Sequence, residues 1–89
     1  MMKMIVAIVR DEDAAGVSQA LTDSQLCVSR IASTGGFLRQ GSSTLMVGVE
    51  EPNVDQAIQI IGEHCPPSVE PMLRRATLFV LNVEHFEQL

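Results

Sequence analysis

The sequence has no tryptophan or tyrosine, and aromatic residues make up only 3% of its 89 residues. Basic residues are also scarce, since six Lys and Arg stand against eleven Asp and Glu and give a net charge of −5. Proteins that bind duplex nucleic acid need clustered Lys and Arg to replace condensed counterions. The six basic residues are scattered here, so we expect neither DNA nor RNA as a partner.

Long hydrophobic runs are missing as well. The longest apolar runs fall far short of the roughly 20 residues that a membrane-spanning helix needs. The opening apolar run leads into Arg10 and three acidic residues without a small-residue cleavage site, which favours a strand over a signal peptide. We therefore expect a cytoplasmic protein that does not insert into membranes.

Side chains for metal binding and catalysis are few. Cys27 and Cys65 have neither metal-ligand spacing nor the density of a disulfide scaffold, and we expect both to be buried free thiols. His64 and His85 lack Cys, Asp or Glu partners at metal-ligand spacing. The sequence predicts no metal, no cofactor and no enzyme activity.

Aliphatic residues are what the chain has in quantity, because 46% of it is hydrophobic with so few aromatic residues. We interpret residues 1–89 as a single domain without a linker. A chain this short buries only about three-fifths of its unfolded surface, which makes its core small. High apolar content in a small domain favours burial between subunits.

The two halves of the chain resemble each other. In each half, an apolar run is followed by acidic residues. After these comes a segment with apolar residues spaced three and four apart, which form one apolar stripe on a helix. Each half ends in another apolar run. The expected strands are 3–9, 26–32, 44–49 and 76–83, and the helical stripes are Ala14, Val17 and Leu21, then Val54, Ala57, Ile58 and Ile61.

The order of these elements is β-α-β-β-α-β. Right-handed strand-helix-strand units in this order interleave into a four-stranded antiparallel sheet with both helices on one face, the ferredoxin-like α+β architecture. Asn53 and Gln56 have the spacing of a capping box at the start of the second helix. That helix should end before Pro66 and Pro67.

The strands also predict an assembly. A sheet covered on one face should alternate apolar and polar residues, yet residues 5–9 and 78–81 are continuously apolar. Helices cover one face only. We therefore expect the other face to meet identical subunits in a closed ring, most plausibly a homotrimer.

The stretch from Ser33 to Ser43 is the most unusual connection. It is longer than a simple hairpin needs and places Phe37 and Leu38 between glycines, which permit positive φ and close approach to a ligand. It matches neither phosphate-binding fingerprint. Phe37 either caps the core or covers a flat, partly apolar ligand. Gly48, within a predicted strand, is typical of close backbone approach or a bulge.

These features together resemble the cyclic-di-AMP receptor family of PII-like signal proteins. The resemblance lies in residues 3–11, in Thr34-Gly35-Gly36-Phe37-Leu38-Arg39, in residues 76–80 and in the ending 83–89. It implies a ferredoxin-like trimer that catalyses no reaction and binds cyclic di-AMP in clefts between subunits. By position it implies these ligand-binding residues: Gln25, Cys27, Ser29, Gly36, Phe37, Leu38, Ser42, Gly48, Phe79 and Gln88.

The chain departs from the family pattern at several of these positions. Gln25 and Ser42 stand where the family has asparagine, Ser29 replaces a threonine, and Cys27 stands where it has arginine. A thiol cannot replace the bidentate, charge-assisted bonds of a guanidinium. The long glycine-rich insertion of the family is also replaced by a short connection, residues 65–75, with three prolines.

Three functions are consistent with these observations. The first is a nucleotide sensor of the PII-like type with cyclic di-AMP as the first candidate ligand. The second is a divergent member that has lost nucleotide binding and acts as a trimeric interaction protein, which the changes at Gln25, Cys27 and Ser42 favour. The third, a small ferredoxin-fold enzyme such as an isomerase, lacks a convincing acid–base pair.

Overall fold

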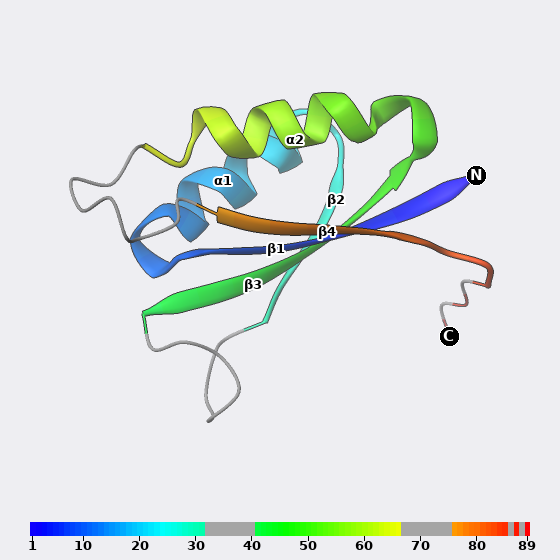
Figure 1. Ribbon diagram of the computed structural model, residues 1–89, viewed down its shortest axis with the longest axis horizontal. Helices are drawn as coiled ribbons and strands as arrows, with labels where there is room; N and C mark the ends of the chain where they lie inside the picture. Colours follow the sequence, from blue (N-terminus) through cyan, green and yellow to red (C-terminus); the bar gives the residue numbers. More distant parts are fainter. Residues whose placement is uncertain (32–40, 67–75, 86, 88) are drawn as a thin grey trace.

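Two helices pack on one face of a four-stranded antiparallel sheet in the computed structural model (Figure 1). The structure describes residues 1–31, 41–66, 76–85, 87 and 89. Its elements follow the predicted order: β1 Met2–Arg10, α1 Asp11–Asp23, β2 Cys27–Ile31, β3 Ser42–Glu50, a 3-10 turn η1 Glu51–Asn53, α2 Val54–Glu63 and β4 Ala76–Asn82. The predicted ferredoxin-like fold is confirmed.

The strands lie in the order β2-β3-β1-β4, so β1 and β3 are central and β2 and β4 form the edges. All neighbouring pairs are antiparallel. Each of the two long central strands pairs along nearly its whole length, from Met2 opposite Glu50 to Arg10 opposite Ser42. Strands β1 and β3 therefore form a continuous platform, to which the shorter edge strands are added.

One face of this platform is the hydrophobic core. Alternate residues of β1 and β3 are buried there against the apolar stripes of α1 and α2, as period-two alternation requires. The largest completely buried side chains of this core include Ile5, Leu45 and Val47 from the sheet and Leu21 and Ile61 from the helices. The helical stripes that the sequence predicted are thus the faces that pack on the sheet.

The opposite face of the sheet, which we call the open face, carries the other alternate residues. No helix of the described ranges covers it (Figure 1), and most of its central side chains are half-buried, with Thr44 buried at 8% exposure. Phe79 and Leu81 on the edge strand β4 are 53% and 51% exposed. Burial on both faces, expected from the unbroken apolar runs, is therefore not reached by the described residues of one chain.

The end of α1 sets the path into β2. The Leu26 N–H donates to the Leu21 carbonyl at 3.0 Å and the Gln25 N–H to the Thr22 carbonyl at 2.9 Å, the paired bonds of a Schellman motif. Gln25 has φ 65° at the position where glycine is usual. A left-handed glutamine thus ends the helix and turns the chain toward the sheet.

The start of α2 differs from the prediction. Asn53 is its N-cap residue, but the side chain makes no capping bond, so the predicted capping box is wrong. The reason is the backbone of Asn53, whose φ of −100° and ψ of 1° continue the preceding 3-10 turn and are not the extended conformation from which a capping side chain reaches the first helical N–H groups. The other end agrees with the prediction, since α2 finishes at Glu63, before Pro66.

Neither helix in the described ranges has the length and apolar character needed to span a bilayer.

Candidate functional site

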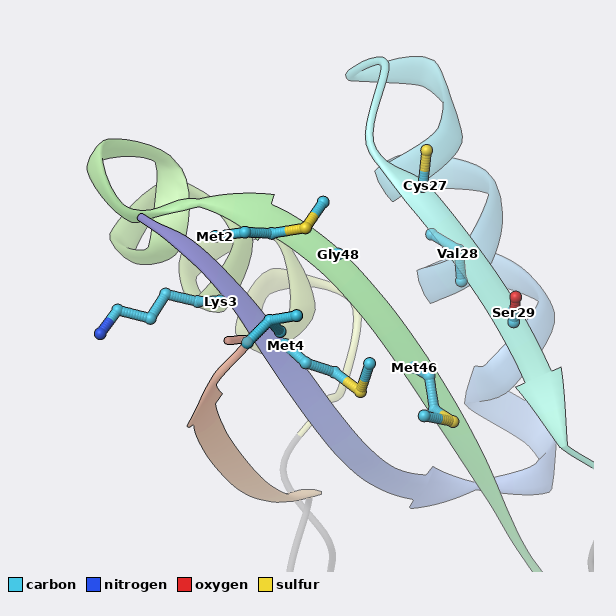
Figure 2. A pocket seen from close by; sticks show the side chains of 9 residues that line it. Met2, Lys3, Met4, Cys27, Val28, Ser29, Met46 and Gly48 are labelled. Atoms are coloured by element: carbon cyan, nitrogen blue, oxygen red, sulfur yellow. The ribbon is translucent and has the colours of Figure 1, made fainter. Parts of the chain in front are cut away.

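A shallow hollow of about 370 Å³ lies on the open face, where β2, β3 and β1 run side by side (Figure 2). Its walls come from both central strands and from the edge strand β2. The residues that line it are Met2, Lys3, Met4, Cys27, Val28, Ser29, Met46, Gly48 and Val83.

Gly48 is the floor of the hollow. It lies between Met4 of β1 and Cys27 of β2 in one continuous row of paired residues, so the strand contains no bulge here. A Cβ atom at this position would lie 3.7 Å from the terminal methyl of Met2. This is an ordinary van der Waals distance, so of the two expectations for this strand glycine the bulge is wrong and the close approach of a ligand stays a prediction.

The β2 wall presents the two small polar side chains of the site. Cys27 and Ser29 are two residues apart and therefore point to the same face, as alternation predicts, and both are exposed. The expectation that Cys27 is buried is wrong, because β2 is an edge strand and neither α1 nor α2 covers this face of it. Cys65, which follows α2, is buried as expected.

Three methionines complete the hollow, and sequence reasoning did not identify them. Met2 and Met4 project from β1 and Met46 from β3, all at even positions that alternate with the buried core residues (Figure 2). Methionine is unbranched and flexible, and its thioether makes favourable contacts with aromatic rings. The walls of the hollow are therefore apolar and adaptable.

The other described residues that the resemblance implies lie outside the hollow. Phe79 is on the open face of β4 and occupies the row that runs from Ser29 through Met46 and Val6. Two strands thus separate Phe79 from Ser29. Ser42 begins β3 opposite Arg10, and Gln25 lies in the turn that precedes β2. Gly36, Phe37, Leu38 and Gln88 lie outside the described residues.

The described basic side chains are directed elsewhere. Lys3 contributes to the rim, but its Nζ donates to Asn82 Oδ1 and points away from the hollow (Figure 2). Arg30 donates to Ser43 Oγ at 3.1 Å on the helix-covered side of the sheet. Arg10 pairs with Asp13 at 2.8 Å and donates to the Pro66 carbonyl.

The acidic side chains are equally separate from the hollow. Glu50 is opposite Met2 at the end of the central pair, and its carboxylate lies 4.0 Å from the N-terminal ammonium. Within the described part of the chain, no three His, Cys, Asp or Glu side chains are grouped to hold a metal ion. The hollow therefore offers apolar contact, one hydroxyl and one thiol to a ligand.

Comparison with solved structures finds a relative that has the same fold. A crystal structure described as a functionally unknown protein from Pediococcus pentosaceus ATCC 25745 is 33% identical in sequence and superposes with a TM-score of 0.80. The match covers 99% of this chain and 97% of that one. The whole domain, and not only its sheet, is therefore shared.

Comparison with family models identifies the protein family, and the result agrees with the sequence motifs and the fold. The model described as cyclic-di-AMP receptor matches residues 2–72, which include every described residue of the hollow except Val83. The chain belongs to the cyclic-di-AMP receptor family.

Proposed function

We propose that the protein is a PII-like signalling protein that binds a nucleotide second messenger, with cyclic di-AMP as the first candidate, in clefts between the subunits of a homotrimer. The observation that carries this proposal is the match to the receptor family over residues 2–72. Such a ligand acts inside the cell, so we place the protein in the cytoplasm.

The geometry of the hollow supports binding at this place. Cys27, Ser29 and Gly48 were assigned to the ligand by resemblance alone, and all three line the same hollow. Because Gly48 has no side chain, a flat ligand can approach the backbone of a central strand between Met4 and Cys27.

The open face supports the trimer. Phe79, Leu81 and Ile31 expose 53%, 51% and 45% of their surfaces, and all three lie on this face of the sheet. Apolar groups exposed together usually mark an interface, since removing them from water is favourable. Packing of open faces in a ring would cover them and place the hollow beside a neighbouring subunit.

Calorimetric titration of the full chain with cyclic di-AMP, ATP and cyclic di-GMP tests the proposal. We expect saturable binding of cyclic di-AMP that exceeds that of the other two nucleotides. A chain that binds none of the three at millimolar concentration would contradict a nucleotide sensor.

The second candidate function is a trimeric interaction protein without a nucleotide ligand. It is favoured by Cys27, whose exposed thiol stands where the family pattern has an arginine. A trimer that binds no nucleotide in the same titration would support this candidate.

A further inference from the structure

Sulfur atoms are concentrated at one place on the open face. The chain has five methionines and two cysteines, and four of these seven residues line the same hollow: Met2, Met4, Met46 and Cys27. We call these four residues the sulfur cluster. They come from three different strands, and none of them belongs to the hydrophobic core of the described residues. Packing of the core therefore does not account for the cluster.

The four side chains surround Gly48 (Figure 2). Met4 and Cys27 flank it in the row of paired residues, and neighbouring strands are about 4.8 Å apart, so their Cα atoms are separated by roughly 10 Å. Met2 already reaches over this position, because its terminal methyl lies 3.7 Å from the place of a Gly48 Cβ atom. The missing side chain thus leaves room for flexible thioethers to approach the thiol above the strand.

The cluster offers the ligands that a soft, singly charged metal ion prefers. Thiolate and thioether sulfurs select Cu(I), whereas zinc sites use cysteine, histidine and carboxylate ligands and not methionine. The ammonium of Lys3, the one charged group among the lining residues, bonds to Asn82 and points away (Figure 2). A Cu(I) ion with one thiolate is neutral, which suits these apolar walls, while a divalent ion would keep an uncompensated charge.

We propose that the sulfur cluster binds one Cu(I) ion through the Cys27 thiolate and the thioethers of Met2, Met4 and Met46. On binding, the S–H bond of Cys27 breaks, a copper–sulfur bond forms and the proton passes to solvent, so the step needs no oxidant or reductant. This site goes beyond the proposed function and does not depend on a nucleotide.

The test titrates the full chain with Cu(I), kept reduced under nitrogen, in competition with the coloured chelator bicinchoninate. We expect one ion per chain, bound at least about a hundredfold more tightly than Zn(II), because thioethers are not zinc ligands. In the NMR spectrum of methyl-labelled methionine, at least two signals should shift on binding. Equal affinity for Zn(II), or methionine signals that do not move, would overturn the proposal.

Four variants locate the ion in the cluster. Met4→Leu and Met46→Leu keep the apolar bulk but remove a thioether, so each should weaken Cu(I) binding by about tenfold with little change in melting temperature. Cys27→Ser removes the charged ligand and should weaken it by at least about a hundredfold. Cys65→Ser is the matched control, since that thiol is buried and does not line the hollow. Methionine variants that bind like the wild type would show that a thiol alone holds the ion, and the proposal would be wrong.

Nucleotide titration of the same protein separates this proposal from the proposed function. If Cu(I) binds and none of the nucleotides does, the metal site stands and the nucleotide sensor is wrong. If cyclic di-AMP binds and Cu(I) does not, only the metal site is wrong. If neither binds, both are wrong.

Discussion

Ser43 on β3 donates a hydrogen bond to the Asp11 carboxylate, and so joins a central strand to the first turn of α1. Arg30 of β2 donates to the same hydroxyl at 3.1 Å, and Ser43 is only 1% exposed. The Asp11 N–H also donates to the Gly41 carbonyl at 2.8 Å, just before β3 begins. One side chain thus connects an edge strand, a central strand and a helix on the covered side of the sheet.

This connection predicts a stability effect at Ser43. Ser43→Ala should lower the free energy of unfolding by about 1–2 kcal/mol, because it removes the two side-chain hydrogen bonds that the buried Ser43 hydroxyl makes with Asp11 and Arg30. Urea denaturation measures the effect. Ser42→Ala is the matched control, since Ser42 is the adjacent residue on the open face, and its cost should stay below about 0.5 kcal/mol. Equal losses in both variants would contradict a special role for Ser43.

The turn after α1 predicts a stabilising substitution. Gln25 holds φ 65°, a conformation that costs a residue with a side chain roughly 1–2 kcal/mol and glycine almost nothing. After allowance for the greater freedom of glycine in the unfolded chain, Gln25→Gly should stabilise the fold by about 0.5–1 kcal/mol. Ser24→Gly is the control, because Ser24 has φ −89° and should gain nothing. A drop in melting temperature for Gln25→Gly would contradict the left-handed turn.

The two thiols should differ sharply in reactivity. Cys27 is exposed and Cys65 is buried, so a disulfide reagent such as Ellman's should modify one thiol per chain quickly and the other only after unfolding. Cyclic di-AMP should slow the fast reaction if it occupies the hollow beside Cys27. The variant Cys27→Ser, which should lose the fast phase, assigns it. A fast phase that persists in this variant would contradict the assignment.

The oligomeric state is the simplest test of the assembly. Light scattering at micromolar concentration should give three times the 9.7 kDa of one chain, because the apolar open face is uncovered in the monomer. A stable mass near that of one chain would exclude the trimer.

Restoring the charge of the family pattern should increase affinity. Cys27→Arg should tighten cyclic di-AMP binding by about ten- to a hundredfold, since charge-assisted hydrogen bonds contribute roughly 1.5–3 kcal/mol. Melting temperature should hardly change, because position 27 is exposed on an edge strand. Cys27→Lys is the control and should gain less, because it offers a point charge without the bidentate fork. Unchanged affinity with normal stability would favour the interaction-protein function.

The fold followed from local patterns that the structure preserves. Spacings of three and four identified Ala14, Val17 and Leu21 as a buried stripe, and all three are completely buried. Only the ends of elements shifted, as at β3, which begins at Ser42 and not at Thr44. These patterns involve residues that are close together in the sequence, so they can be recognised without knowledge of the tertiary structure.

The site was harder to predict because it depends on register. Alternation along a strand shows which residues share a face of that strand, but it does not show which residues of different strands are neighbours. Only the pairing of the strands shows that Met4 and Cys27 flank Gly48 in one row. The family resemblance supplied Cys27, Ser29 and Gly48 without the methionines. The methionines could have been found from their even positions in β1 and β3. Those positions identify the open face only when the odd positions are known to form the core.

The division of the sheet into a covered and an open face has an evolutionary consequence. Folding depends on odd-numbered residues such as Ile5 and Leu45, whereas ligand contact would depend on even-numbered neighbours such as Met4 and Met46 and on the exposed Cys27. Substitutions at the second set leave the core intact. The proposed ligand contacts, Cys27 among them, can therefore vary through single replacements while the buried core that the fold requires stays the same.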